Sequence, residues 1–464
     1  MAARAPGAGS PTPPGGRRSG APTIECVPST SADDPPGDPA GLDVRPFRAL
    51  TYREHRPDQL ARVSSPAYDL VTAAGRDRLA AADPHNIVRL ILPHVERTPQ
   101  HPAPATGSAA TASATLRRWL AEDVLVRDPD PALWRYEMAR PGVPATSGWL
   151  AAVGLPRPGS TAVLPHEDTY APAVEGRRAL LDATATDLEP IVLAHDPDPA
   201  VQAETDRTGA TAPTLEVADP DGVVHRLWRV SDPATLRRLT AAFAGTRSVI
   251  ADGHHRFAAA REHQLRGGHD DEAVLALLTP MGPGGLRVQA IHRVLPDLTL
   301  AEATAGAAAG FSTADITPAV GDLTSVVGPW LAGTERPAFL LTDGRRVVEL
   351  TSPAAEVYAS VPLEAPPAWR GLDVVLAHHG LFGRLLDRSD DPASVLVAHD
   401  VPEALQLAGE RAGVAVLLRS PSPGDVAEVA RAGARMPRKS TLFVPKPRTG
   451  LVLRPHDEEP GRPA

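Results

Sequence analysis

The sequence contains almost no cysteine. Of its 464 residues only Cys26 is a cysteine, and it lies in a segment rich in proline, glycine and serine. A single cysteine excludes an intramolecular disulfide and a metal cluster of several thiolates, and this position argues against a cysteine nucleophile. The composition fits a protein of the cytoplasm, where disulfides are rare.

A long hydrophobic run is also missing. No apolar stretch approaches the roughly 20 residues that a membrane-spanning helix needs, and the N-terminus lacks the apolar core of a signal peptide. The net charge of −9 provides no basic surface for nucleic acid or an anionic membrane. We therefore expect a soluble, cytoplasmic protein that binds a small molecule, and neither nucleic acid nor a membrane. The sequence indicates no oligomeric state.

Lysine and asparagine are scarce. Only two of the 47 basic residues, Lys439 and Lys446, are lysines, and Asn86 is the only asparagine. Lysine offers a compact ammonium group that arginine does not replace, so two lysines within one octet suggest a binding site, although codon usage is the alternative explanation. Residues seven apart in a strand face opposite sides. We therefore expect one lysine to enter the site, namely Lys439, which adjoins the hydroxyls of Ser440 and Thr441.

The length favours two domains, because single cores rarely grow beyond about 250–300 residues. Residues 1–42 and 454–464 are polar and proline-rich, which predicts disordered tails. Between the tails, short apolar runs alternate with stretches of helical spacing. This pattern predicts an N-terminal α+β domain at 43–298 and a C-terminal α+β domain at 299–453.

The elements of both domains follow from hydrophobic periodicity. Strands are predicted at 90–92, 149–153, 191–193, 223–230 and 248–251. Helices are predicted at 113–122, 177–185, 234–243, 257–265, 299–309, 372–386, 402–409 and 424–433. The Asp343-Gly344 pair between two alternating runs predicts a hairpin over 337–350.

The main chemical motif is Asp252-Gly253-His254-His255-Arg256, placed between a predicted strand and a predicted helix. Glycine allows the backbone to approach a ligand, and the first helical amides attract an anion such as phosphate. The arginine can add a bidentate contact, and the histidines can donate hydrogen bonds. Adjacent helical histidines point about 100° apart, which is unsuitable for sharing a zinc ion. The alternative is an ordinary helix capped by Asp252.

This motif, extended to Ile250 through Phe257 with Ala259, resembles the signature of the bacterial and archaeal family called domain of unknown function 1015. Seven further segments match in order, at 45–50, 66–70, 86–90, 164–169, 177–181, 292–293 and 436–451. The resemblance therefore spans roughly 45–453. Two positions depart from the family pattern, because Ala67 replaces a proline and Phe257 replaces a tyrosine.

The Gly-His-His-Arg motif of this family is similar in turn to an arginine-bearing sequence motif of the ParB/sulfiredoxin superfamily. The resemblance implies a ParB/sulfiredoxin-like mixed α/β core, with the C-terminal α+β domain added to it. It also implies that Gly253, His254, His255 and Arg256 bind nucleotide phosphates. Sulfiredoxin chemistry requires a cysteine where this chain has His254, so that branch is excluded.

Free-serine kinases belong to the same superfamily. The resemblance therefore implies a kinase, a transferase that moves phosphate from ATP, ADP or pyrophosphate to a hydroxy amino acid, with free L-serine as the expected acceptor and Mg²⁺ on the phosphates. One alternative is a regulatory switch that binds CTP or ATP. Another is a phosphate-ester hydrolase that uses water as the acceptor.

Phosphoryl transfer needs cations on the phosphate and a carboxylate that takes the acceptor proton or holds Mg²⁺. His166 and Glu167 follow an apolar run, and we expect Glu167 to be the general base with His166 beside it. Asp252 is the alternative base or the Mg²⁺ ligand, and Lys439 is expected on the phosphate. An ordinary polar turn is the competing interpretation of the 166–169 segment.

Four further residues are predicted to bind substrate. Tyr68, Asp69 and Asn86 can recognise the amino and carboxylate groups of a small substrate, and Arg177 can bind phosphate or a carboxylate. Packing and turn formation are the alternative roles of these residues.

Overall fold

The computed structural model describes residues 41–93, 105–267, 273–320, 322–334, 336–389, 391, 393–437 and 439–456. By its internal contacts the chain divides into Met1–Gly37 and Asp38–Ala464, and the fold below is that of the second unit. Of the tails predicted at 1–42 and 454–464, residues 1–40 and 457–464 lie outside the described residues. Within the described residues, no helix is long and apolar enough to cross a membrane.

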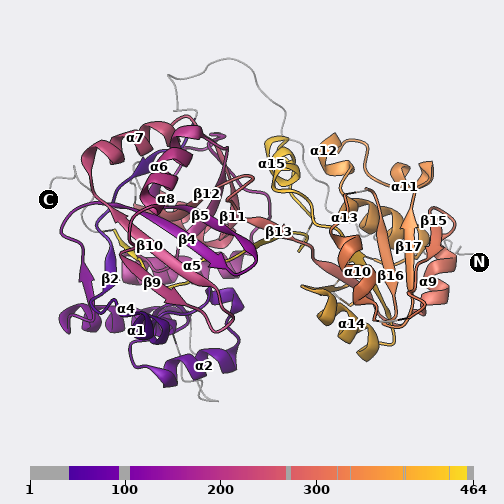
Figure 1. The fold of residues 1–464 in the computed structure, drawn as a ribbon, viewed down its shortest axis with the longest axis horizontal. Helices are drawn as coiled ribbons and strands as arrows, with labels where there is room; N and C mark the ends of the chain where they lie inside the picture. Colours follow the sequence, from indigo (N-terminus) through magenta and orange to yellow (C-terminus); the bar gives the residue numbers. More distant parts are fainter. Residues whose placement is uncertain are drawn as a thin grey trace, which may run out of the picture. The chain divides into compact units, whose positions relative to one another are not determined.

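The first part of the fold is a nine-stranded mixed sheet (Figure 1). Its order is β6-β11-β8-β12-β5-β4-β10-β9, and β1 also pairs with β5. The strands are β1 (Val44–Arg45), β4 (Leu133–Arg140), β5 (Val143–Gly154), β6 (Val163–Leu164), β8 (Ile191–His195), β9 (Leu215–Ala218), β10 (Val224–Val230), β11 (Ser248–Asp252) and β12 (Ala273–Pro280). Most neighbours are antiparallel, but β6 runs parallel to β11 and β8 runs parallel to β12.

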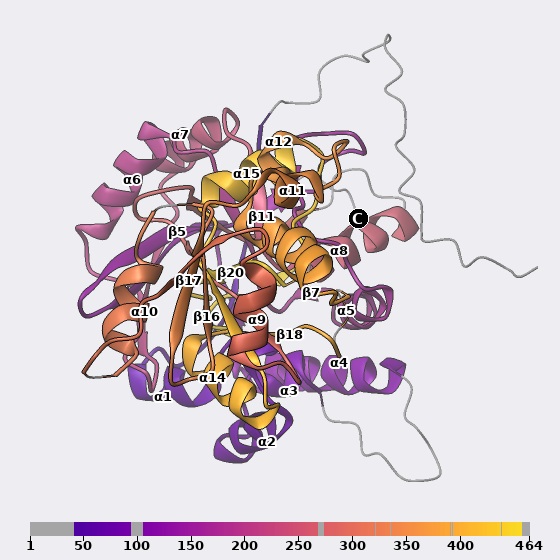
Figure 2. The same cartoon turned by 90° about the vertical axis from the view of Figure 1, so that its right-hand side faces the viewer.

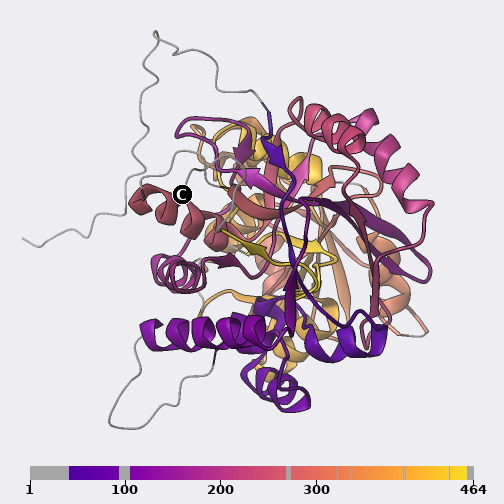
Figure 3. The ribbon, with the colours of Figure 1, turned by 90° about the vertical axis from the view of Figure 1, so that its left-hand side faces the viewer.

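Both faces of this sheet are buried, because successive side chains of a strand point to opposite faces. On β5, Trp149, Ala151 and Val153 join one core cluster, whereas Leu150 and Ala152 join the other. The first cluster includes side chains of α6 (Pro199–Gly209), α7 (Pro233–Phe243) and α8 (His254–Gly267). The second includes side chains of α1 (Pro57–Val63), α3 (Val88–Ile91) and α4 (Ala105–Ala121). Figure 3 shows the indigo and violet helices α1 and α4 on the opposite side from α6 and α7.

A second, six-stranded sheet has the order β15-β17-β16-β19-β14-β18. Its strands are β14 (His292–Leu295), β15 (Ser312–Asp315), β16 (Phe339–Thr342), β17 (Val347–Thr351), β18 (Leu396–Ala398) and β19 (Val414–Leu418). Helices α10 (Thr324–Leu331) and α14 (Val401–Glu410) pack on one face. On the other face lie α9 (Leu300–Ala307), the π-helix η2 (Ala377–Leu385) and α15 (Pro423–Arg431), as Figure 2 shows for α9 and α10.

The remaining elements are further helices and three small sheets. The helices are η1 (Tyr68–Leu70), α2 (Ala73–Ala82), α5 (Ala171–Thr184), α11 (Ala355–Ala359), α12 (Pro367–Arg370) and α13 (Asp373–Leu376). Three two-stranded sheets join β2 (Leu50–Tyr52) to β3 (Leu125–Arg127), β13 (Arg287–Gln289) to β20 (Leu442–Val444), and β7 (Thr186–Asp187) to β21 (Arg454–Pro455).

Several helices begin at a cap residue followed directly by proline. The side chains of Asp198, Asp232 and Ser422 accept hydrogen bonds from the first-turn amides, and Pro199, Pro233 and Pro423 follow them. Proline is well suited to this position because its missing N–H would be unpaired there in any case. Much of the abundant proline is therefore compatible with helices.

Most of the predicted elements are confirmed. The hairpin forms from β16 and β17, and the strands and helices of the main chemical motif are present as β11 and α8. The strand predicted at 90–92 is wrong, because Val88–Ile91 forms the buried helix α3. A short apolar run that is buried on every side does not distinguish a strand from a helix.

Residues 454–456, the last that the structure describes, belong to the first part of the fold. The predicted C-terminal tail starts at Arg454, but Arg454 and Pro455 pair with β7. The buried carboxylate of Asp187 accepts hydrogen bonds from the Leu275 amide at 2.8 Å and from Arg454 at 3.0 Å, and it lies 3.3 Å from His456. Burial raises the pKa of Asp187, but His456 and Arg454 outweigh it and lower the pKa to about 2.

This arrangement predicts the effect of truncation. A chain ending at Leu453 loses Arg454 and His456, which both contact Asp187, and leaves the buried carboxylate without its cationic partner Arg454. This loss costs about 3–5 kcal/mol of unfolding free energy. A chain ending at His456 keeps the partners and should match the full chain. Urea unfolding of the three chains measures the difference, and equal midpoints would show that Asp187 does not need these partners.

Candidate functional site

Two motifs meet at one edge of the nine-stranded sheet. Strand β6 leads to His166 and Glu167, and strand β11 ends at Asp252, where the main motif begins. Because β6 and β11 are parallel neighbours, their carboxyl ends lie at the same edge. The main-chain N–H of His166 donates to Nε2 of His254 at 3.2 Å and joins the two motifs directly.

Gly253 shapes the turn between β11 and α8. Its φ is 91°, a conformation that favours glycine. A side chain there would also meet Ile191 Cγ2 at 2.9 Å and Arg256 Nε at 3.0 Å. The glycine is therefore required both by the backbone conformation and by the close approach of Arg256.

Asp252 is enclosed by two cations. Its Oδ2 accepts from Nη2 of Arg256 at 2.5 Å, and its Oδ1 lies 2.8 Å from Nζ of Lys446. Burial raises the pKa of Asp252, but the charges of Arg256 and Lys446 outweigh it and lower the pKa below the usual value. Asp252 therefore stays ionised and positions the two cations. This geometry does not fit the predicted role of Asp252 as an alternative general base.

The magnesium prediction for Asp252 fits no better, because both of its carboxylate oxygens already contact cations. In the described parts of the chain, no group of three or more His, Cys, Asp or Glu side chains is arranged to hold a metal ion.

The lysine in contact with Asp252 is Lys446, whereas we expected Lys439 to be the lysine of the site. Lys446 is buried and also forms an ion pair with Asp69. Lys439 lies outside β20, has a φ of 52° and is exposed, so the alternation rule for strands does not apply to this pair. Its charge nevertheless influences Glu167 and His255.

Tyr68 is held between two arginines. The guanidinium carbon of Arg177 lies 4.1 Å from the centre of the tyrosine ring, and that of Arg256 lies 5.6 Å from it. The Tyr68 amide donates to Oε1 of Glu189 at 3.1 Å, and the Thr449 hydroxyl donates to the same oxygen at 2.9 Å. Sequence analysis did not identify Glu189, because it lies in no motif. Tyr68, Asp69 and Arg177, which we expected to bind substrate, thus lie beside the main motif.

Glu167 has the properties of a proton acceptor. Its carboxylate accepts a hydrogen bond from the Thr441 hydroxyl at 3.1 Å, and Thr441 lies 3.1 Å from Nε2 of His166. Burial raises the pKa of Glu167, against the opposing effects of Thr441 and Lys439. A carboxylate with a raised pKa accepts a proton more readily near neutral pH.

The histidines of the site are neutral. Burial lowers the pKa of His166 to about 4 and lowers that of His254 well below its usual value. Burial and the charge of Lys439 lower the pKa of His255, whose Nε2 accepts from the Tyr170 amide at 3.1 Å. His254 uses Nε2 for His166 and is buried, so it holds the two motifs together and is not available to bind phosphate through Nε2.

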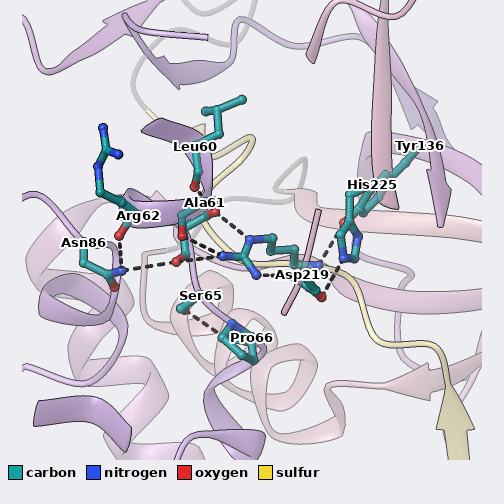
Figure 4. Close-up of polar contacts among 11 residues, drawn as sticks. Leu60, Ala61, Arg62, Ser65, Pro66, Asn86, Tyr136, Asp219 and His225 are labelled. Carbon is teal, nitrogen blue, oxygen red and sulfur yellow. Dashed lines mark hydrogen bonds and ion pairs between the residues drawn. The ribbon is translucent and has the colours of Figure 1, made fainter. Parts of the chain in front are cut away.

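Asn86 has a structural role, and the prediction that it binds substrate was wrong. Its side-chain amide donates to the carbonyls of Arg62 at 2.6 Å and Ser64 at 3.2 Å, and its oxygen accepts from the Val88 amide at 3.0 Å. Figure 4 shows the first two of these bonds. Asn86 is completely buried, so no side-chain group remains for a ligand.

A second polar network fixes the segment that carries Lys446. The Arg448 amide donates to the Tyr136 hydroxyl at 2.9 Å, which lies 2.8 Å from Nδ1 of His225. Nε2 of His225 lies 2.8 Å from Asp219, and Asp219 forms an ion pair with the Arg448 guanidinium (Figure 4). The ring of contacts is closed, and no motif in the sequence indicated it.

Comparison with known proteins identifies the family. Residues 44–375 match the family described as protein of unknown function DUF1015. The match covers more than half of the chain, so the chain belongs to this family. No curated protein matches the sequence.

Solved structures share only a distant likeness. A free serine kinase in complex with AMP is 13% identical with a TM-score of 0.30, over 64% of this chain and 87% of that chain. A conserved hypothetical protein from Pyrococcus furiosus is 14% identical with a TM-score of 0.29, over 64% and 90%. SbnI with a C-terminal truncation from Staphylococcus aureus is 11% identical with a TM-score of 0.34, over 67% and 90%. These TM-scores carry no argument about function.

Because these histidines are buried and neutral in the fold, we expect the free energy of unfolding to depend on pH. The pKa of His166 falls from about 6.5 in the unfolded chain to about 4 in the fold, so unfolding takes up a proton between these values. Stability should therefore be lost as the pH falls from 6.5 towards 4, by at most about 1.4 kcal/mol per pH unit for this residue. Denaturant unfolding across this range should show a shallower slope for His166→Gln than for the exposed control His55→Gln. Parallel slopes would contradict the assignment.

Proposed function

We propose that this member of the DUF1015 family is a small-molecule kinase. It transfers a phosphoryl group from ATP, ADP or pyrophosphate to the hydroxyl of a hydroxy amino acid, and free L-serine is the first acceptor to test. The observation that carries the proposal is the common edge of β6 and β11, where Arg256 and Lys446 contact the carboxylate of Asp252 and the charge of Lys446 also acts on Glu167. Phosphoryl transfer needs mainly such cations and one proton acceptor.

The donor phosphates bind at the amino end of α8. The first amides of a helix and its dipole attract anions, and Gly253 leaves room for a close approach. Nε of Arg256 is buried and has no hydrogen-bond partner among the described residues. A buried donor of this kind requires an explanation, and a bound phosphate oxygen would satisfy it. Lys446 adds a compact ammonium from the opposite side of Asp252.

The acceptor hydroxyl reacts on the Glu167 side. Its oxygen forms a bond to the transferred phosphorus while the bond from that phosphorus to the leaving phosphate oxygen breaks. The leaving group departs with the bonding electrons, and the hydroxyl proton passes to the Glu167 carboxylate. Thr441 orients this carboxylate, and the raised pKa of Glu167 makes it a suitable acceptor. Lys439 lies within electrostatic range of Glu167 and can attract the entering anion.

A direct assay tests the reaction. The full chain is incubated with L-serine and, separately, with ATP, ADP and pyrophosphate, and O-phosphoserine is measured by mass spectrometry. We expect product with at least one donor. Release of phosphate at the same rate with and without serine would point to the hydrolase instead, and nucleotide binding without transfer would point to the switch protein. The serine version fails if no donor produces O-phosphoserine.

Two substitutions separate binding from chemistry. Arg256→Ala removes the donor contact and should weaken donor binding by about tenfold or more, whereas Glu167→Gln should lower kcat and leave donor affinity nearly unchanged. Calorimetric titration with the donor and steady-state rates give both quantities. The exposed Arg157, changed to alanine, is the control for the loss of one positive charge. Unchanged donor affinity in Arg256→Ala would show that the turn has only a structural role.

A further inference from the structure

A large cavity lies beside the phosphoryl-transfer site and shares one residue with it. The cavity has a volume of about 580 Å³, and Lys446 lines it together with Pro445, Pro447 and Arg448. Pockets of roughly 300–1,000 Å³ hold ligands much larger than an amino acid. Free serine alone would leave most of this space unfilled.

The cavity walls are mainly apolar and rigid. Twelve of the 21 lining residues are apolar, and five of these are prolines, whose backbone is restricted before any ligand arrives. The apolar lining consists of Pro66, Ala67, Leu70, Met138, Ala139, Val143, Pro144, Pro220, Val223, Val444, Pro445 and Pro447. Such walls favour a ligand with an apolar body.

Three of the six charged residues of the lining are already in ion pairs. Arg448 is paired with Asp219, and Lys446 is paired with Asp252 and Asp69. His225, which also lines the cavity, has both ring nitrogens in hydrogen bonds to Tyr136 and Asp219. The polar ring of Figure 4 therefore forms a wall without unsatisfied side-chain groups that would recognise a ligand.

Two exposed arginines in the lining remain available. Among the residues that the structure describes, Arg140 and Arg287 form no side-chain hydrogen bond or ion pair. Asp221 is the one further exposed charged residue of the lining, so the available groups carry a net positive charge. Arginine binds carboxylates through paired hydrogen bonds, so this balance favours a ligand with one anionic group.

We propose that this cavity binds the acceptor, and that the acceptor is a hydroxy acid with an apolar body larger than that of serine. Its carboxylate contacts Arg140 or Arg287, its apolar body fills the proline-lined space, and its hydroxyl lies towards Lys446. The role as acceptor rests on the proposed function, whereas binding to the cavity does not.

Three matched probes test the ligand class. L-serine, N-benzoyl-L-serine and N-benzoyl-L-serine methyl ester share the hydroxyl and differ in the apolar body and the carboxylate. Calorimetric titration of the full chain without donor should show N-benzoyl-L-serine binding about tenfold or more tightly than L-serine because of the buried ring. It should also bind about tenfold more tightly than its ester, because the ester lacks the carboxylate. Equal affinities for the three compounds would overturn the proposal.

Variants locate the binding. Ala139→Trp fills the cavity and should abolish binding of N-benzoyl-L-serine, whereas Ala314→Trp, at an exposed strand position outside the cavity, should not. The double variant Arg140→Ala and Arg287→Ala should remove the preference for the acid over the ester, and Arg157→Ala should leave it unchanged. Because the arginines are exposed, this double variant tests the proposal even if Ala139→Trp fails to fold. The proposal would be overturned if neither Ala139→Trp nor the double arginine variant changed the binding of N-benzoyl-L-serine.

The experiments distinguish a failure of the cavity proposal from a failure of the proposed kinase function. If N-benzoyl-L-serine binds in the cavity, and neither it nor L-serine is phosphorylated with any donor, the result supports the cavity site and contradicts the kinase. Phosphorylation of L-serine together with no binding of the benzoyl compound supports the kinase and contradicts the cavity site.

Discussion

The contact between Lys446 and Asp252 is the interaction on which the site depends. Asp252 ends β11 and begins the main motif, whereas Lys446 comes from a segment almost 200 residues later. A buried carboxylate is costly unless cations compensate it, and Lys446 and Arg256 together do so. In return, Asp252 holds both cations at the amino end of α8. The proposed phosphate site exists only when the C-terminal segment is in place.

The segment around Lys446 is positioned by a polar network on its other side. Arg448 contacts Tyr136 through its amide and Asp219 through its guanidinium, and His225 links these two partners. Buried polar networks are favourable when every member is satisfied and costly when one is not. This closed ring therefore restricts the chain two residues from Lys446. The same ring forms part of the cavity wall, so one network supports both sites.

The two carboxylates of the site, Asp252 and Glu167, have different surroundings and therefore different pKa shifts. Asp252 contacts two cations and stays ionised, whereas Glu167 accepts a hydrogen bond from the Thr441 hydroxyl and has a raised pKa. Two histidines of the motifs, His166 and His254, are buried and neutral, and they join the segment after β6 to α8. A carboxylate kept charged to hold phosphate-binding cations and another poised to take a proton is the pattern expected for phosphoryl transfer.

The sequence by itself determined the local features. The strand, glycine turn and helix around Gly253 follow from short-range patterns, as does the hairpin at 337–350, because backbone conformation and periodicity act over a few residues. Only the tertiary structure decided which lysine reaches Asp252, that Asn86 is used up by backbone groups, and that Glu189 joins the site. Those outcomes depend on pairings between residues far apart in the chain, and side-chain spacing carries no information about them. The parallel pairing of β6 with β11, which brings the two motifs to one edge, is such a long-range contact.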